Sequence, residues 1–197
     1  KRFLWVRMFR FMKANRVIKI LIKYRLHYLA YFLLSVASIL LGRFSLFKLI
    51  EDDLWLQKQG QIFFCDYTPN YRLKQNEIDS LSNEIFFNSY LPKKKDICVD
   101  IGAGLGHETR LMSIMTGHDG KVFSIEATKK TYKALEECVY YNKLHNVTLS
   151  HCAITNKKGP VMIADDIGHH TENKIIVDEG SSSLTVRGLT MDQYLEY

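Results

Sequence analysis

The sequence has few prolines, few cysteines and no repeated or low-complexity tract. Its 197 residues include only 3 prolines and 4 cysteines. The cysteines stand far apart, with no C-x-x-C pair and no spacing typical of zinc ligands, which argues against a disulfide scaffold or a metal site. The lack of a repeat excludes a solenoid. A hydrophobic fraction of 47% with 12% aromatic residues is enough to bury a core, so the chain is not a disordered one.

Acidic residues are missing from the N-terminal quarter of the chain. Residues 1–48 contain 11 Lys and Arg and no acid, and the first acid is Glu51. The other 149 residues contain 16 basic and 21 acidic side chains. This division indicates a basic extension over residues 1–50 and an acidic domain over residues 60–197. Because the domain carries the negative charge, we expect no nucleic acid among its partners.

The extension is apolar as well as basic. Residues 1–25 predict a basic helix, and residues 26–42 (LHYLAYFLLSVASILLG) contain no Lys, Arg, Asp or Glu. As a helix this second segment is about 25 Å long, short of a hydrocarbon core of about 30 Å, although apolar residues after Arg43 could lengthen it. It could span a membrane, lie in the plane of an anionic membrane surface, pack on protein, or be a cleaved secretory signal.

Strands and helices alternate in the domain. Apolar spacing and capping residues predict helices over 76–91, 106–116 and from 129 to about 145. Short apolar runs predict strands over 62–67, 97–101, 121–126, 147–152, 160–164 and 184–188, with 97–101 buried. This order predicts an α/β fold with a Rossmann-like, doubly wound, mostly parallel sheet, which binds ligands beyond the carboxyl ends of its strands.

Three alternating glycines follow the strand predicted over 97–101. Gly102, Gly104 and Gly106 stand in the run VDIGAGLGHET and open the next helix. Glycine lets the backbone turn tightly and approach a ligand with no Cβ in the way, and a helix N-terminus attracts anions. Glu126 ends the next strand twenty residues beyond Gly106, where an acid can accept hydrogen bonds from ribose hydroxyls.

Such a loop has three interpretations. The dinucleotide fingerprint is G-x-G-x-x-G, whereas this chain has G-x-G-x-G with His107 in the place of the last glycine. S-adenosylmethionine is favoured over NAD, because Asp100, two residues before the first glycine, is typical of loops that bind it. A structural turn without a ligand is the third interpretation.

Four stretches together carry a resemblance. They are DICVDIGAGLGHET (96–109), KVFSIEATKKTYKALEECVYYNKLHNVTL (121–149), the alanine and polar hairpin of 153–159, and the serine-rich and Thr-Met-Asp segments of 181–195. With these stretches, the chain resembles the FkbM-type methyltransferases over about residues 60–197, a family with the class I, S-adenosylmethionine-dependent fold. Gly104 and Ala127 depart from the Asn and Pro that are usual there. The family continues into an Asp-x-Glu-Gly motif, so the resemblance implies a chain truncated at its C-terminus.

The resemblance also implies a reaction, O-methylation of a small-molecule, glycan or lipid-linked hydroxyl. The residues expected at the cofactor are Asp100 at its ammonium group, Gly102, Ala103, Gly104 and Gly106 at its methionine part, Glu126 at the ribose, and Ala127 and Ala153 near adenine. The general base is not assigned; His107, Glu108 and Asp192 are candidates by residue type. A non-catalytic, membrane-attached scaffold or a degenerate relic is the alternative.

The cofactor also bears on the extension. A membrane span would place the basic residues in the cytoplasm and the domain on the opposite side of the membrane. S-adenosylmethionine is scarce on that side. We therefore favour the in-plane helix, with residues 1–48 at a membrane and the domain on the cytoplasmic side.

Overall fold

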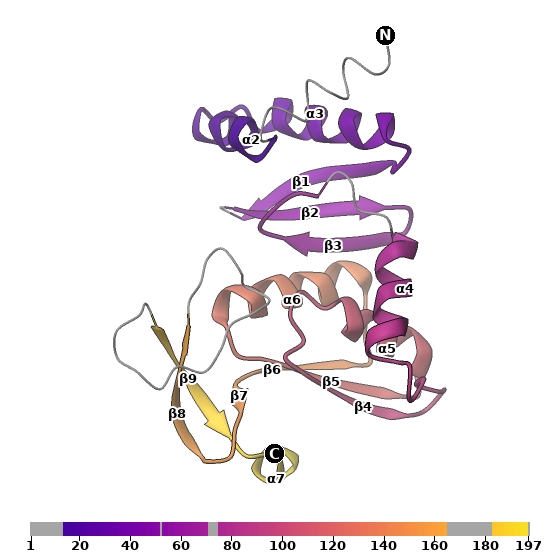
Figure 1. The fold of residues 1–197 in the computed structure, drawn as a ribbon, viewed down its shortest axis with the longest axis vertical. Coiled ribbons are helices and arrows are strands. Elements are labelled where there is room, and N and C mark those ends of the chain that lie inside the picture. The colour runs from indigo at the N-terminus through magenta and orange to yellow at the C-terminus, as the bar shows by residue number, and fades with distance from the viewer. Residues whose placement is uncertain (1–13, 52, 71–74, 165–182, 197) are drawn as a thin grey trace. The chain divides into compact units, whose positions relative to one another are not determined.

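The computed structural model describes residues 14–51, 53–70, 75–164 and 183–196, and the chain divides into two compact units (Figure 1). We call Lys1–Gln75 the N-terminal unit and Asn76–Tyr197 the C-terminal unit. The sequence placed this boundary between residues 50 and 60, ahead of the strand predicted over 62–67. The boundary lies later because that strand pairs within the N-terminal unit.

The N-terminal unit combines two helices with an antiparallel sheet. Its elements are α2 (Ala14–Lys23), α3 (His27–Leu40), β1 (Ser45–Glu51), β2 (Leu54–Gln59) and β3 (Ile62–Asp66). The strands pair in the order β1-β2-β3. The predicted extension is helical in α2 and α3, and residues 1–13 lie outside the described ones. Residues 45–50, which were included in the extension, form most of β1. Buried and exposed residues alternate at the start of β1, as expected for a strand with one covered face.

Helix α3 ends at a turn that its apolar sequence does not reveal. Gly42 and Phe44 both have left-handed backbone, with φ of 70° and 55°, so the helix cannot continue into the apolar residues after Arg43. The backbone N–H of Ser45 donates to Oγ of Ser38 at 2.9 Å. This hydrogen bond fastens the end of α3 to the start of β1, where helix had been expected.

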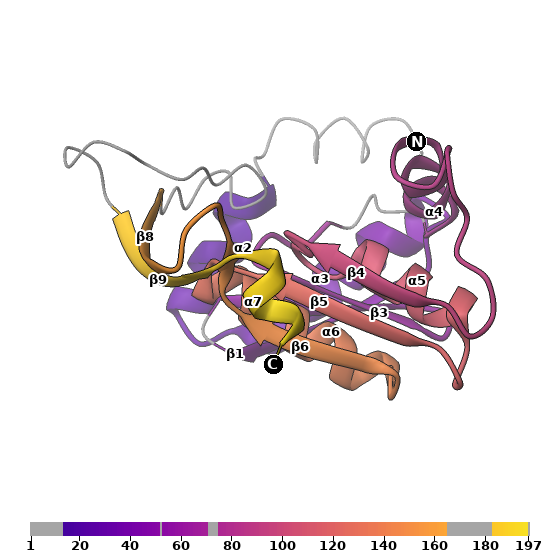
Figure 2. The same cartoon turned by 90° about the horizontal axis from the view of Figure 1, so that it is seen from below.

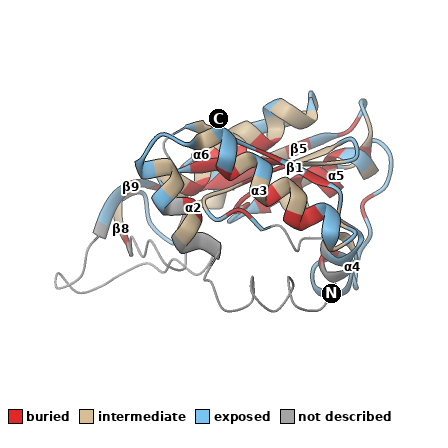
Figure 3. Cartoon of the chain, turned by 90° about the horizontal axis from the view of Figure 1, so that it is seen from above, coloured by how far each residue is buried: buried red, intermediate tan, exposed pale blue. Residues whose placement is uncertain are grey.

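The core of the N-terminal unit lies between its helices and its sheet. Ala30 and Leu34 of α3 form a buried cluster with Ile18 of α2, Phe47 of β1 and Trp55 of β2. Figure 3 shows buried and exposed residues on different sides of α3, so one side of the helix packs on protein. In the described ranges, no helix combines the length and the apolar character needed to cross a membrane.

The C-terminal unit alternates strands and helices as predicted. Its elements are α4 (Gln75–Ile85), β4 (Ile97–Ile101), α5 (His107–Thr116), β5 (Lys121–Glu126), α6 (Lys129–Asn142), β6 (Val147–His151), β7 (Ala153–Ile154), β8 (Gly159–Ala164), β9 (Ser183–Leu189) and α7 (Met191–Leu195). Two predicted helices are shorter than expected. One stops at Ile85 instead of residue 91, and the other stops at Asn142, where Lys143 turns into the left-handed region.

Strands β4, β5 and β6 form a parallel sheet in that order. Helices α5 and α6 connect them and lie on the same side of the sheet in Figures 1 and 2. Ser124 of β5 contacts Thr109 of α5, so the next residue, Ile125, faces the opposite side. There Ile125 packs with Leu189 of β9, and Tyr194 of α7 packs on the same cluster. A parallel sheet covered on both faces is the predicted Rossmann-like arrangement.

The remaining strands form a second sheet in the order β7-β9-β8. β8 and β9 pair antiparallel, and β7 pairs with β9 in parallel. Strand β4 was predicted to be buried, and this prediction is wrong. Its residues Ile97 and Ile101 are 70% and 55% exposed. The cause is that β4 lies at the edge of its sheet and has a neighbour, β5, on one side only among the described strands.

Helix α5 is held at both ends by polar side chains. At its C-terminal end, the amide of Asn146 donates to the carbonyl oxygens of Ser113 and Gly117 at 3.2 and 2.8 Å, which satisfies acceptors that a helix end leaves open. Nearer the start, buried Arg110 forms an ion pair with Asp79 of α4. The first turn of α5, which follows the glycine loop, is therefore fixed in place.

Candidate cofactor site

A pocket opens at the carboxyl ends of β4 and β5, where a doubly wound sheet places its ligands. Six of the eight residues predicted at the cofactor line it, namely Gly102, Ala103, Gly104, Glu126, Ala127 and Ala153. The other two, Asp100 and Gly106, are not among the lining residues and support the pocket from behind. The sequence thus predicted residues that line one pocket, and their contact with a cofactor stays a prediction.

The glycine loop is fastened to β5 through its backbone. The N–H groups of Gly102 and Ala103 both donate to the carbonyl oxygen of Ile125, at 2.9 and 3.0 Å. Gly102 and Gly104 have φ of 77° and 56°, a region that glycine adopts without strain. A Cβ added at Gly102 would meet no atom within 4 Å, and one at Gly104 would meet only a backbone oxygen at 3.9 Å. The loop therefore leaves open space at these positions.

The side chain of Glu126 connects the loop to the end of β5. Its Oε2 accepts a hydrogen bond from the N–H of Gly104 at 3.0 Å, and its Oε1 accepts one from the N–H of Thr128 at 2.8 Å. Each carboxylate oxygen has about two acceptor positions, so one remains on each for a further donor. Glu126 is only 8% exposed. It is placed to accept from a pair of hydroxyl groups, the arrangement predicted for ribose.

Asp100 lies behind the loop and contacts protein. Its Oδ2 accepts from the hydroxyl of Thr109 at 2.5 Å, and that hydroxyl is 3.0 Å from Oγ of Ser124. These bonds join the ends of β4 and β5 to the first turns of α5. Burial raises the pKa of Asp100 to about 6, and the nearby charges of Glu108 and Glu126 also raise it, against the lowering effect of the Thr109 hydroxyl. A contact between Asp100 and an ammonium group stays a prediction.

Gly106 serves helix packing. It is the residue before α5 and has φ of 87°. A Cβ at this position would lie 2.8 Å from Cδ1 of Leu135 and 3.2 Å from Sγ of Cys138, both on α6. Because a side chain does not fit there, the third glycine of the motif lets α5 and α6 approach each other.

The wall of the pocket away from the loop is apolar. Cys152 and Ala153 line it together with Ile154 of β7 and Ile163 of β8. Ala153 and Ile163 belong to one buried cluster, with Ala127 packed against it. Apolar walls of this kind suit a flat ring system. Ala127 and Ala153, the residues expected near adenine, both belong to this wall.

The sequence did not predict several lining residues, which are Phe86, Leu105, Thr128, Ile154 and Ile163. The two isoleucines resemble ordinary strand residues, and no periodicity shows which of them will face a pocket. They reach it because β7 and β8 belong to the second sheet, whose position relative to β5 depends on long-range contacts.

Two of the three candidate bases reach the pocket. His107 and Glu108, at the start of α5, line it, whereas Asp192 in α7 is exposed and does not. Oε1 of Glu108 accepts from the hydroxyl of Ser82 at 2.7 Å, which holds this carboxylate in place. A negative side chain is also stabilised in the first turn of a helix.

The pocket is suited to a cationic nucleoside. Glu126 and Glu108 line it, and Asp100 lies close enough for its pKa to respond to both. S-adenosylmethionine fits this set, since its sulfonium and ammonium groups are positive, its ribose offers two hydroxyls and its adenine is flat. The described residues contain no cluster of three or more potential metal ligands, while residues 165–182, with His169 and His170, lie outside them.

The parallel sheet and its glycine loop define the class of fold, and one family model matches this part of the chain. The family model of protein-L-isoaspartate(D-aspartate) O-methyltransferase (PCMT) matches residues 78–155, which run from α4 through the glycine loop, β5 and α6 to β7. None of the curated proteins that were compared matches the chain.

Several solved structures are similar to part of the chain. A SAM dependent methyltransferase from Aquifex aeolicus is 24% identical over 40% of this chain and 47% of its own, with a TM-score of 0.32. TYW2 from M. jannaschii, in complex with AdoMet, is 21% identical over 53% of this chain and 45% of its own, with a TM-score of 0.38. A protein-L-isoaspartate O-methyltransferase is 19% identical over 71% of this chain and 42% of its own, with a TM-score of 0.33. The chain spans less than half the length of each.

The C-terminal unit has a Rossmann-like α/β fold, with β4, the glycine loop and β5 at the candidate cofactor site. The fold predicted from the sequence is confirmed. The match to a methyltransferase model agrees with the predicted cofactor, S-adenosylmethionine.

Proposed function

We propose that the protein is an S-adenosylmethionine-dependent methyltransferase of the FkbM type, and that it methylates a hydroxyl group. The observation that carries the proposal is the pairing of Glu126 with the Gly104 backbone across a pocket lined by open glycine positions. An acid in this place suits ribose, and the absence of side chains on the loop leaves room for the rest of the cofactor.

In this proposal the chain mainly binds and orients. Bound S-adenosylmethionine supplies an electrophilic methyl group, so the protein contributes position and electrostatics. Glu126 accepts from the ribose hydroxyls, and the apolar residues Ile154 and Ile163 cover the base. Asp100 keeps the glycine loop and α5 in register through Thr109. His107 and Glu108, at the rim, are the described side chains placed to take a proton from an acceptor hydroxyl.

The acceptor class rests on the FkbM resemblance. The residues that match the isoaspartate methyltransferase model, 78–155, are those of the cofactor side, so this match supports the cofactor more than any acceptor. We propose a small-molecule, glycan or lipid-linked hydroxyl. The acidic balance of the residues after 48 disfavours a nucleic acid.

Calorimetry with S-adenosylhomocysteine and with NAD tests the cofactor. We expect binding of S-adenosylhomocysteine with a dissociation constant in the micromolar range, which is about −8 kcal/mol, and much weaker binding of NAD. Binding of NAD alone would overturn the assignment. Thermal unfolding followed with each compound gives an independent readout, since a ligand that binds the folded state stabilises it.

The second candidate is a cofactor-binding scaffold without catalysis. Incubation with S-adenosylmethionine labelled in its methyl group, followed by separation of lipid, glycan, protein and small-molecule fractions of a cell extract, distinguishes the two. Label in one fraction, lost with Glu126→Ala, supports the enzyme and names its acceptor class. Binding of S-adenosylhomocysteine without transfer to any fraction supports the scaffold.

A further inference from the structure

We propose that the N-terminal unit docks on an anionic phospholipid membrane through the outer face of α3 and a cationic pocket beside the start of that helix. The inference goes beyond methyl transfer, because it rests on residues of the N-terminal unit alone. It concerns the site of action and not the reaction.

Helix α3 is apolar on opposite sides. Ala30 and Leu34 are buried, whereas Leu29, Phe32 and Leu40 are 44%, 63% and 67% exposed. At about 100° per residue, the exposed three lie on the side of the helix opposite to the buried two. The helix itself contains no Lys, Arg, Asp or Glu. A helix that is apolar all round is normally buried all round, so the outer face of α3 has the character of a contact surface.

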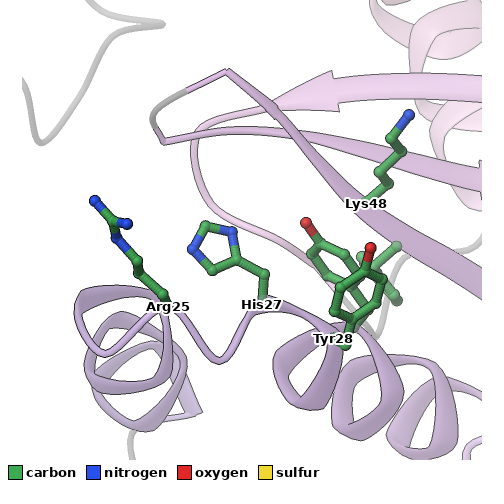
Figure 4. A pocket seen from close by; sticks show the side chains of 6 residues that line it. Arg25, His27, Tyr28 and Lys48 are labelled. Carbon is green, nitrogen blue, oxygen red and sulfur yellow. The ribbon is translucent and has the colours of Figure 1, made fainter.

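A pocket with cationic side chains lies beside this face (Figure 4). It is lined by Arg25 from the connection between α2 and α3, by His27 and Tyr28 from α3, and by Lys48 from β1. Arg25, Tyr28 and Lys48 are exposed, and Figure 4 shows Arg25 and His27 on one side of Tyr28 and Lys48 on the other. Guanidinium and ammonium groups are suited to phosphate oxygens. Tyr28, at 87% exposure, adjoins both the pocket and the outer face.

Charge decides which occupant covers this surface. Residues 1–48 carry 11 basic side chains and no acid, and each Lys or Arg close to an anionic leaflet increases binding by about fivefold. A second copy of the chain would bring two such basic segments together, where they repel. A nucleic acid would match the charge but not the apolar face. A bilayer with anionic headgroups matches both, with phosphate in the pocket and acyl chains against Leu29, Phe32 and Leu40.

Vesicle sedimentation with the full chain tests the apolar face. We expect the protein to bind vesicles of phosphatidylcholine mixed with phosphatidylserine, and the substitutions Phe32→Ser and Leu40→Ser each to weaken binding by about tenfold. Ile114→Ser is the matched control, because Ile114 is 60% exposed on a helix of the C-terminal unit. Thermal unfolding of each variant establishes that it is folded. Folded variants that bind as tightly as the parent would overturn the proposal.

A second set of variants tests the cationic pocket. We expect Arg25→Gln and Lys48→Gln each to weaken binding about fivefold, while Lys94→Gln, an exposed lysine of the C-terminal unit, leaves it unchanged. Vesicles of phosphatidylcholine alone should bind far less than the mixed vesicles. Equal binding to both vesicle types would contradict the role given to the pocket.

Analytical ultracentrifugation without vesicles tests the alternative that a second copy of the chain covers the outer face of α3. A dimer that Phe32→Ser dissociates would show that a second copy covers α3, which would overturn the membrane proposal. A monomer that binds mixed vesicles supports it. Vesicle binding should persist in Glu126→Ala, so failure of the cofactor assignment and failure of the membrane assignment are separately visible.

Discussion

Glu126 and Gly104 are joined by a hydrogen bond of 3.0 Å from the backbone N–H of the glycine to the carboxylate of the acid. The bond crosses from β5 to the loop after β4, so one side chain both sets the shape of the loop and faces the pocket. The other oxygen of the same carboxylate accepts from Thr128 at the start of α6. Loop shape and ligand contact at this site are therefore coupled.

Replacement of Glu126 by alanine should weaken binding of S-adenosylhomocysteine by about 1–3 kcal/mol, the cost of leaving ribose hydroxyls without partners in a shielded site. Calorimetry measures the change. Glu136→Ala, on α6 and away from the lining residues, should bind as the parent does. A folded Glu126→Ala with an unchanged dissociation constant would show that the carboxylate shapes the loop and does not hold the ligand.

The first and third glycines should respond differently to alanine. Gly106→Ala should lower the free energy of unfolding by more than about 1 kcal/mol, because its Cβ would lie 2.8 Å from Leu135 and its φ of 87° is unfavourable for alanine. Gly102→Ala carries the strain of φ of 77° but meets no atom within 4 Å, so it should be less destabilising and should mainly weaken ligand binding.

Urea unfolding and calorimetry on the two variants separate stability from affinity. If Gly102→Ala binds S-adenosylhomocysteine as tightly as the parent does, the ligand does not occupy the open space beside Gly102. If Gly106→Ala is as stable as the parent, α6 moves to accommodate the methyl group and the packing role is wrong.

The sequence predicted the C-terminal unit far better than the N-terminal one, for a physical reason. Around the glycine loop, strand, turn and helix signals are local and agree with one another, so β4, α5 and β5 were placed within about one residue. In the N-terminal unit, Gly42 and Phe44 make the turn before residue 45, and the strands β1 and β2 that follow are stabilised by pairing with each other. Pairing partners cannot be read from one segment alone.

The same distinction holds within the site. Gly104 and Glu126 could be assigned to one pocket because both belong to a local pattern, a glycine loop after one strand and an acid at the end of the next. The different roles of Gly102 and Gly106 could not be predicted, because the role of Gly106 depends on where Leu135 and Cys138 of α6 lie. The contribution of Ile163 likewise depends on how the second sheet meets the first.

The ion pair of Arg110 with Asp79 should be important for stability. Arg110 is 3% exposed, and removal of one partner leaves a buried charge without its counter-charge. We expect Asp79→Ala to lower the free energy of unfolding by about 3 kcal/mol. The control is Glu137→Ala, whose salt bridge with Lys133 lies within one helix and is partly exposed, so that loss should be below about 1 kcal/mol. Equal, small effects in urea unfolding would show that Arg110 finds another partner.

Asp100 should make stability depend on pH in mildly acidic solution. Its pKa in the folded protein is about 6, above the ordinary value of 3.8. The unfolded chain therefore releases this proton first as pH rises, and the folded state loses relative stability from about pH 4 until the carboxylate is ionised above about pH 6. A shift of about 2 units corresponds to about 3 kcal/mol.

Asp100→Asn removes this ionisation and keeps an oxygen that can accept from Thr109. We expect the parent and the variant to differ least in stability near pH 4, and the variant to gain on the parent by up to about 3 kcal/mol as pH rises past about 6. Urea unfolding of both proteins over this range measures the difference in their free energies of unfolding. The other carboxylates titrate alike in the parent and the variant, so their contributions cancel in this difference. Parallel stability curves would mean that Asp100 ionises at its ordinary pKa, and that the buried contact with Thr109 is made by a carboxylate already charged.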